Sequence, residues 1–440
     1  MIRLLHISDI HFKSPQCIDP DTDPDVSIRD LLSEDIQSFA TKSDKNVDAI
    51  LITGDIAFAG KVTEYSAASI WLDELCKVTG CQPQDVYVVP GNHDIDRIKA
   101  DSPILAAFRE QVLSKQSKLE RDDKMNSFLL DPLSRQTIFS TMQAYNDFAS
   151  RYGCEINLST CWRDSIAVSE NVDLNLIGMT STLLSSAQDD LHRLVVDCSQ
   201  TVFRKQPGKL YLTMMHHPCD WIIDGNVVQD NLDNHIHIQL FGHTHRSRWN
   251  ETDNTIRISA ISLHPERHDL EYEPGYNIID ISNMDSTTGV SNIEVKVFVR
   301  VLQQHPLRFI AKEFKEGKNY FSRIFAIRNK VFTTDENIAG CAPSSNEFFF
   351  NDLAVAPEER FHSIDAMLNT KSVRELVYDF WGLTGSQKRK ILEELRLLTD
   401  DDWNLPDVER QKIAFKNAED RGQLKELEQV IILRMQENVR

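Results

Sequence analysis

Five short segments rich in aspartate and histidine each follow an apolar run, and this arrangement restricts the fold more than any other feature. The runs before them include 2–7, 49–53 and 86–89, and they are typical of buried strands. In open α/β sheets, ligand sites gather at the carboxyl ends of the strands. The pattern therefore predicts a fold that brings the five segments to one place. They are Asp9-x-His11, Gly54-Asp55, Gly91-Asn92-His93-Asp94, His216-His217-Pro218 and Gly242-His243-Thr244-His245.

Stretches with helical spacing of apolar residues separate the first predicted strands. In 28–41 and 63–78 the apolar side chains recur three and four positions apart, so we expect helices there. This alternation of strand and helix predicts an α/β domain. Further strands are expected at 174–178, 210–215, 237–241, 256–262, 276–281 and 293–302. We expect the last three to be antiparallel, with a turn at 285–289.

The chain divides into three predicted parts. Residues 1–302 form the α/β domain, which carries a helical insertion at about 100–150 because that stretch is charged and lacks strand signals. Residues 303–370 form a linker or an extension packed on the core. Residues 371–440 form a small all-α domain, with breaks at Gly385, Pro406 and Gly422. Its expected helices are 372–382, 386–398, about 407–419 and 422–436.

Basic and aromatic residues interleave within the extension, at 308–330. Seven basic residues stand there against two acidic ones. Such a stretch could bind single-stranded nucleic acid through charge and stacking. It could instead be an amphipathic segment packed on the core with a solvated face, and we favour this second interpretation.

The amino-acid composition limits the possible cellular compartment and the possible classes of function. The formal charge is −19, from 48 basic and 67 acidic residues, which argues against a protein that coats duplex DNA. Eight cysteines are scattered without a C-x-x-C pair, which indicates a reduced, intracellular protein. No apolar run approaches the roughly 18 residues of a membrane span. We therefore expect a cytoplasmic protein without a membrane association.

The strand-end segments carry the residue types that bind divalent metals. Aspartate, histidine and asparagine together suit manganese, iron, zinc or nickel, and we expect manganese first. A single tetrahedral zinc needs three or four ligands, whereas this set suits a pair of ions about 3.5–4 Å apart. His217 stays open between a role in shaping the pocket and no role. The seven candidate ligands are Asp9, His11, Asp55, Asn92, His216, His243 and His245.

The order D-x-H, G-D, G-N-H-D, H, G-H-x-H resembles the calcineurin-like metallophosphoesterases over about residues 1–300. The resemblance implies a β-sandwich of two mixed sheets flanked by helices. It also implies that Asp55 bridges two ions, that His93 acts near the leaving group as a general acid, and that Asp94 orients His93. One ion would bind Asp9, His11 and His245, and the other Asn92, His216 and His243.

The same resemblance implies a metal-dependent phosphoester hydrolase. The forms V-P-G-N-H-D and H-H-P favour a phosphodiesterase acting on nucleotides or nucleic acid, either a cyclic-nucleotide phosphodiesterase or a nuclease. A phosphomonoesterase, such as a phosphoprotein phosphatase, is the alternative because the same metals serve both reactions. A signalling adaptor, in which the tail determines the biology, is a third hypothesis.

The C-terminal pattern F-W-G-L-T…R-K-I-L-E-E-L…A-E-D-R-G-Q-L-K-E-L resembles death-like or effector-associated adaptor domains of bacterial immunity proteins. The resemblance implies that 371–440 docks a protein partner by like-with-like contact, and an oligomerisation tail that binds a second copy of the chain is the simpler alternative. It also suggests an effector in bacterial antiviral defence, by analogy alone.

Overall fold

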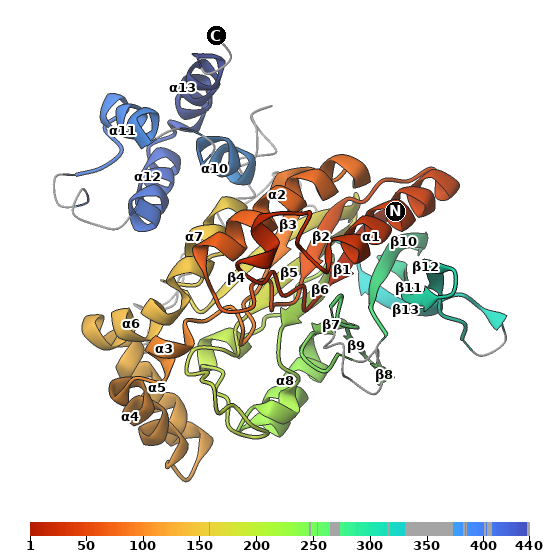
Figure 1. The fold of residues 1–440 in the computed structure, drawn as a ribbon, viewed down its shortest axis with the longest axis horizontal. Coiled ribbons are helices and arrows are strands. Elements are labelled where there is room, and N and C mark those ends of the chain that lie inside the picture. The colour runs from red at the N-terminus through yellow and green to blue at the C-terminus, as the bar shows by residue number, and fades with distance from the viewer. Residues whose placement is uncertain are drawn as a thin grey trace, which may run out of the picture. The chain divides into compact units, whose positions relative to one another are not determined.

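The chain folds into two compact units, Met1–Asn329 and Lys330–Arg440, and we describe each by itself. Figure 1 shows the computed structural model, coloured from the N-terminus to the C-terminus. The structure describes residues 1–157, 159–245, 248–252, 254–264, 273–287, 289–314, 317–330, 373–381, 383, 385–399, 402 and 407–437.

The first sheet of the first unit has seven strands. Its path runs β12-β11-β10-β1-β2-β3, and β13 also pairs with β11. The pairs β1/β2 and β2/β3 are parallel, whereas the other pairs are antiparallel, so the sheet is mixed. The strands are β1 (Ile2–Ile7), β2 (Ala49–Ile52), β3 (Val86–Val88), β10 (Gly275–Thr287), β11 (Val290–Gln304), β12 (Leu307–Ala311) and β13 (Phe321–Arg328).

The second sheet has six strands in the order β4-β5-β6-β7-β9-β8. Its inner pairs β5/β6, β6/β7 and β7/β9 are parallel, and both outer pairs are antiparallel. The strands are β4 (Cys161–Ser169), β5 (Val172–Met179), β6 (Lys209–Met215), β7 (Ile238–Phe241), β8 (Arg248–Glu251) and β9 (Ile256–Ser259).

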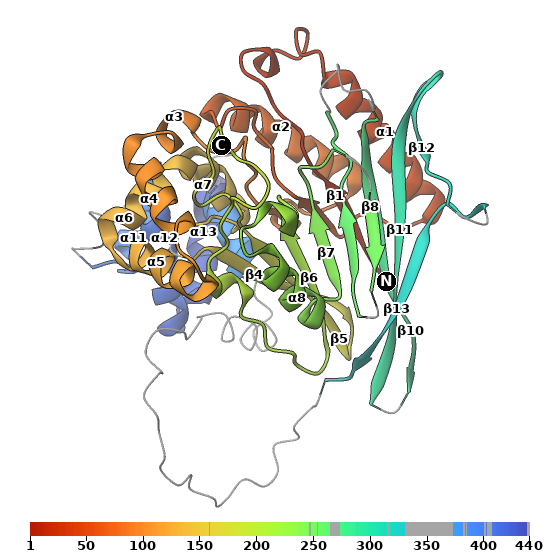
Figure 2. The same cartoon turned by 90° about the horizontal axis from the view of Figure 1, so that it is seen from below.

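The two sheets pack face to face between helices. Figure 2 shows α1 (Val26–Ser43) and α2 (Val62–Thr79) on one side and α8 (Gly225–His235) on the other. The predicted fold class, two mixed sheets flanked by helices, is confirmed. Short 3-10 turns connect the elements at Gln16–Ile18, Pro83–Asp85, Ser140–Met142, Ser150–Tyr152, Cys198–Thr201 and Cys219–Trp221.

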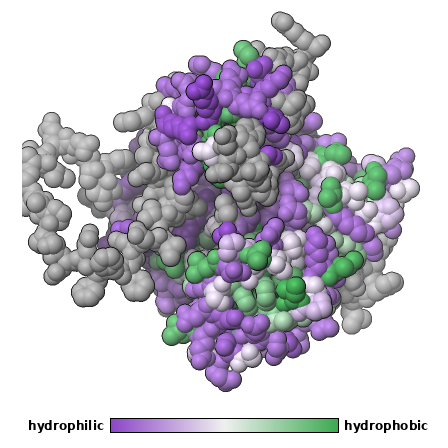
Figure 3. Space-filling model, turned by 90° about the vertical axis from the view of Figure 1, so that its left-hand side faces the viewer, coloured by the Kyte–Doolittle hydropathy of each residue, from purple (hydrophilic) through white to green (hydrophobic). Residues whose placement is uncertain are grey.

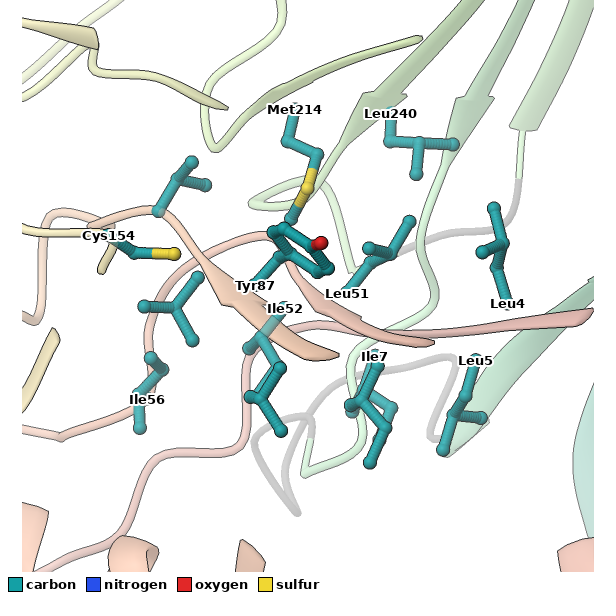
Figure 4. Close-up of a cluster of buried hydrophobic side chains, with 14 of the residues drawn as sticks. Leu4, Leu5, Ile7, Leu51, Ile52, Ile56, Tyr87, Cys154, Met214 and Leu240 are labelled. Carbon is teal, nitrogen blue, oxygen red and sulfur yellow. The ribbon is translucent and has the colours of Figure 1, made fainter. Parts of the chain in front are cut away.

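Alternation along the buried strands builds the core. In Figure 4, Leu4 and Leu51 point toward Met214 and Leu240 of the second sheet, whereas Leu5, on the same strand as Leu4, points to the opposite face. Successive side chains of a strand face opposite sides, so a strand buried on both faces is predominantly apolar. Every residue of β1 and β2 is indeed buried. This packing fixes the positions of the strand ends, and therefore of the polar residues that directly follow them.

A helical segment is inserted after β3, as predicted. Its exposed apolar side chains include Ile104, Leu119, Leu130 and Leu133. Figure 3 shows the side of the molecule on which this segment lies, where apolar groups are interspersed among hydrophilic ones. The helices are α3 (Arg97–Ala100), α4 (Pro103–Leu113), α5 (Lys118–Leu130), α6 (Pro132–Phe139) and α7 (Gln143–Ala149).

The structure corrects the expected pairing of the late strands. The stretch 256–262 was expected to be antiparallel with the two strands that follow it, but β9 lies in the second sheet and runs parallel to β7. Of the three expected strands, β10 and β11 do pair with each other as an antiparallel hairpin. Propensity alone does not determine which sheet a short apolar strand joins, because the partner is set by tertiary packing.

The extension at 303–330 carries β12 and β13, which both pair with β11 and continue the first sheet. Its aromatic rings pack against the protein: Phe321 stacks on the partly exposed Trp249 with ring centroids 5.4 Å apart, and Phe325 is buried. Arg323 pairs with Glu251, and Lys312 with Glu273. These contacts support the packed segment rather than a nucleic-acid surface. The expected loop near 340–346 lies outside the described residues.

Four helices of the second unit enclose their own apolar core, as predicted. Phe380 and Phe415 meet edge to face with ring centroids 5.5 Å apart, and Leu376, Leu427 and Ile431 are buried beside them. The helices are α10 (Val373–Trp381), α11 (Gly385–Glu394), α12 (Asp407–Asp420) and α13 (Leu424–Glu437). Across the described parts of both units, no helix combines the length and the apolarity that crossing a membrane requires.

Candidate metal centre

All five strand-end segments meet at one end of the two sheets. Each candidate ligand lies one to four residues after the last residue of its strand, or in the turn just beyond. The first sheet contributes the loops after β1, β2 and β3, and the second contributes the loops after β6 and β7. Because parallel strands end at the same edge, residues more than 200 positions apart in the chain come together there.

The first group of side chains is Asp9, His11 and His245, whose ligand atoms all lie within 4.8 Å of one another. The Nε2 atom of His245 is 3.3 Å from Oδ1 of Asp9. The Nε2 atom of His11 is 4.0 Å from the same oxygen. Asp9 is fully buried and its Oδ1 accepts no hydrogen bond. A buried carboxylate oxygen without a hydrogen bond is costly unless a cation compensates its charge.

The second group contains His216, Asn92 and His243. The Nε2 atom of His216 is 3.1 Å from Oδ1 of Asn92. The rings of His216 and His243 lie 5.2 Å apart. His216 donates from Nδ1 to the carbonyl of Thr53 at 2.7 Å, so its Nε2 is free to act as a ligand. The second group therefore has the chemistry of a nitrogen-rich metal site.

Asp55 lies between the two groups. Its Oδ2 is 3.3 Å from Nε2 of His216 and 3.9 Å from Nε2 of His11. Its Oδ1 accepts a hydrogen bond from the backbone N–H of His93 at 2.8 Å. One carboxylate thus contacts both histidine groups, as a bridging ligand must.

Electrostatics in the centre favour ionised carboxylates. Burial raises the pKa of Asp55, but the charge of His216 and its hydrogen bond outweigh burial and lower that pKa well below its ordinary value. Burial lowers the pKa of His216, but Asp55 outweighs burial and raises it to about 9. Divalent cations would take the place of the protons that now balance these charges. The donor set therefore fits a pair of divalent ions.

His93 is oriented by a backbone carbonyl. Its Nδ1 donates a hydrogen bond to the carbonyl of Phe58 at 2.7 Å, and its ring lies 4.7 Å from that of His11. The expectation that Asp94 orients His93 differs from this geometry, because the Phe58 carbonyl already occupies Nδ1.

Asp94 instead braces the loops that carry the ligands. Its carboxylate accepts hydrogen bonds from the backbone N–H groups of Ile56, Ala57 and Gly91, and from the hydroxyl of Tyr65 at 2.9 Å. Burial and the neighbouring charge of Asp55 raise the pKa of Asp94 to about 7. Asp94 therefore ties the loop after β2 to the loop after β3.

Five of the candidate ligands adopt a left-handed backbone. Non-glycine residues rarely have positive φ, and each such residue costs about 1–3 kcal/mol. Their clustering at one place indicates that the surrounding structure holds them there for function. The φ values are 54° for Asp9, 53° for His11, 53° for Asp55, 65° for His243 and 54° for His245.

Gly91 is required by close packing against Asp55. A Cβ atom at Gly91 would lie 2.2 Å from Oδ1 of Asp55 and 2.5 Å from its backbone nitrogen. We predict that Gly91→Ala displaces Asp55 and weakens metal binding at least tenfold, because outer contacts of ligands tune affinity by about 10–100-fold. Isothermal titration with Mn²⁺ measures this. A change in thermal stability with unaltered Mn²⁺ affinity would contradict it.

Several residues of the centre belong to no motif in the sequence. Trp221 lies edge-on to His243, with ring centroids 4.2 Å apart. The hydroxyl of Ser181 is 2.7 Å from Nδ1 of His217, and the half-buried ring of Phe58 lies 5.1 Å from His93. Each is distant in sequence from its partner or acts through its backbone, so no local motif contains it.

Two mixed sheets with an aspartate- and histidine-rich centre at their strand ends define a metallophosphoesterase. The chain belongs to the calcineurin-like phosphoesterase family, whose family model matches residues 2–247. Calcineurin-like phosphoesterases bind divalent metals, which agrees with the clusters of aspartate and histidine side chains at this centre. A GTPase-associated adaptor domain matches residues 372–432, which agrees with the expected adaptor-like tail.

Similar proteins include an uncharacterized metallophosphoesterase-like protein, YydB, of Bacillus subtilis (strain 168). It is 28% identical over 270 residues, which are 60% of this chain and 52% of that protein. The chain thus spans about half the length of this relative.

Two solved structures are also similar. GAP50, the anchor in the inner membrane complex of Plasmodium, is 11% identical over 76% of this chain and 90% of its own, with a TM-score of 0.37. A single mutant of Vps29 from Entamoeba histolytica is 12% identical over 74% of this chain and 100% of its own, with a TM-score of 0.28.

Proposed function

We propose that the chain is a dinuclear-metal-dependent phosphodiesterase that hydrolyses nucleotide or nucleic-acid phosphodiester bonds. The observation that carries this proposal is the position of Asp55, which contacts a histidine of each ligand group. A bridging carboxylate between two sets of ligands is the arrangement that two-metal hydrolases need. When bound, the ions would supply a nucleophilic water at neutral pH and neutralise charge on the phosphoryl oxygens.

The residues of the chain supply the rest of the reaction. The protonated imidazole of His93 would donate its Nε2 proton to the departing alkoxide oxygen, and the neutral ring would keep its Nδ1 proton on the carbonyl of Phe58. The carbonyl therefore fixes the ring plane before and after the transfer. Asp94 would hold the two loops that position His93 and Asp55.

The surroundings of the centre favour a diester with an aromatic base. Phe58, which contacts His93 and His11, and Trp221, which contacts His217 and His243, are only partly buried. Neutral aromatic rings suit a nucleobase, which stacks on them.

The test compares matched substrates in the presence of Mn²⁺. We expect faster hydrolysis of bis-p-nitrophenyl phosphate than of p-nitrophenyl phosphate, and turnover of nucleotide diesters. Faster turnover of the monoester or of phosphopeptides would instead favour the phosphatase alternative. Parallel assays with cyclic nucleotides, linear DNA and plasmid DNA separate a small-nucleotide enzyme from a nuclease. Substituting Zn²⁺, Fe²⁺ or Ni²⁺ for Mn²⁺ identifies the preferred metal.

Trp221 provides a prediction about the base. Stacking of a base on an aromatic side chain contributes about 1–3 kcal/mol, so Trp221→Ala should raise KM for thymidine 5′-p-nitrophenyl phosphate about tenfold or more. Methyl p-nitrophenyl phosphate has no base, and its KM should change little. Trp221→Phe, which keeps a ring, is the matched control. Equal increases in KM for both substrates would argue against stacking.

We further propose that residues 372–432 bind a protein partner. The support is the match to an adaptor domain together with a self-contained apolar core in this unit. The enzyme would then be an effector recruited through its tail, which the family analogy associates with bacterial antiviral defence. Deletion of 371–440 should abolish complex formation and leave phosphodiester hydrolysis intact. A second copy of the chain as partner would appear as dimers in sedimentation experiments.

A further inference from the structure

His217 is buried in the centre with one ring nitrogen unused. Its side chain is 0% exposed. Its Nδ1 is 2.7 Å from the hydroxyl of Ser181, the second residue after β5, whereas its Nε2 has no hydrogen-bond partner. A buried polar atom without a partner costs free energy and requires an explanation.

The neighbouring histidine shows what such an arrangement can do. His216 also has an oxygen partner at Nδ1, the carbonyl of Thr53 at 2.7 Å, and its Nε2 faces Asn92 and Asp55. Metal-binding histidines are held in this way, with one nitrogen anchored to an oxygen atom and the other directed at the ion. His217 repeats this geometry one residue further along the chain.

The imidazoles of His216, His217 and His243 are close enough to share an ion. One ring nitrogen from each of His216, His217 and His243 lies within 4.8 Å of the other two. Nitrogen ligands at about 2.1 Å from an ion are separated by about 3.0–4.2 Å, so small side-chain movements would complete the site. The ring of His217 is 4.7 Å from that of His216 and 4.3 Å from that of His243.

We propose that Nε2 of His217 is a ligand of the second metal ion, together with His216 and His243. This inference rests on the proposed dinuclear centre and deepens it. A third imidazole would make this ion's surroundings richer in nitrogen than those of the first ion, which has Asp9. Imidazole suits zinc, iron and nickel better than manganese, so the second position would discriminate against manganese.

The experiment measures metal binding rather than turnover. The full chain, stripped of metal with a chelator, is titrated with Zn²⁺ or Mn²⁺ as the parent protein and as His217→Ala, His217→Gln and Ser181→Ala. We expect the first equivalent to bind unchanged and the second at least tenfold more weakly in both His217 variants. Ser181→Ala should show a smaller loss in the same step. His237→Asn removes a histidine outside the centre and serves as the matched control.

A direct readout does not depend on any variant. Pulsed electron paramagnetic resonance of the Mn²⁺-loaded parent should detect three coordinating histidine nitrogens at the second position. Two such nitrogens, or unchanged binding of both equivalents in His217→Ala, would overturn the inference.

The two proposals can fail separately. If the parent binds fewer than two ions, or if Asp55→Ala binds both ions normally, the proposed centre itself is wrong. If the parent binds two and Asp55→Ala loses them, while His217→Ala keeps both, only the role of His217 is wrong.

Discussion

Replacing Asp55 with alanine should abolish Mn²⁺-dependent hydrolysis and weaken both metal-binding steps together. The Oδ2 atom of Asp55 lies near a histidine of each group, at 3.3 Å from Nε2 of His216 and 3.9 Å from Nε2 of His11. Metal ions stabilise the charge of such transition states by several kcal/mol, so we expect kcat/KM to fall about 10³-fold or more. Steady-state assays with bis-p-nitrophenyl phosphate and a Mn²⁺ titration measure the two effects.

The fold should survive this change. Removal of Asp55 relieves its repulsion with Asp9, a fully buried neighbour that shares the centre. Circular dichroism and the melting temperature without added metal should therefore be close to those of the parent, whereas stabilisation by Mn²⁺ should be lost. Asp131→Ala, which removes an exposed helix cap far along the sequence, should keep full Mn²⁺ binding and activity. Near-normal turnover in Asp55→Ala would exclude a bridging role.

The parts of the fold that could be predicted are those with a strong local pattern. The strands that became β1, β2 and β6 are predominantly apolar runs, and the helices α1 and α2 have clear helical spacing. The candidate ligands could be named because each follows such a run directly. The end of a strand determines where the side chains that follow it can lie. The local sequence pattern therefore also predicts their position in the folded domain.

The parts that could not be predicted depend on contacts between distant segments. The sheet that β9 joins is decided by its neighbour β7, and the sequence of β9 does not show this. The Phe58 carbonyl acts on His93 from 35 residues away, and any residue type could provide that backbone group. Ser181 faces His217 from the end of another strand. Such partners appear only once the chain is folded.

The left-handed backbone of the candidate ligands could not be predicted either. Aspartate tolerates positive φ better than most residues, but histidine in this region gives no clear signal. In the structure, the backbone N–H of His243 donates to Oδ2 of Asp9 at 3.2 Å, and the N–H of Asp9 donates to the carbonyl of Gly54. These bonds between loops hold conformations that a single loop would not adopt.

Replacing His93 with alanine should slow catalysis without removing the metals. His93 lies outside the expected ligand set, and its Nδ1 is fixed by the Phe58 carbonyl, so its other nitrogen is the proton donor we propose for the leaving oxygen. Loss of a general acid costs about 10²–10⁴-fold in rate. We expect a fall of this size in kcat for nucleotide diesters, whose ribose alkoxide is a poor leaving group. Rapid-quench or product-release assays measure it.

A comparison of two leaving groups tests whether His93 acts as a general acid. A p-nitrophenolate ion departs without a proton, so bis-p-nitrophenyl phosphate should be hydrolysed by His93→Ala at close to the parent rate, while the nucleotide diester is not. His93→Gln, which can donate a hydrogen bond but not a proton, should restore little of the nucleotide activity. Equal losses for both substrates would contradict proton donation. Because one nitrogen of His93 also lies within 4.8 Å of ligand atoms of His11 and Asp55, the Mn²⁺ titration of the same variant would then show whether His93 binds the metal instead.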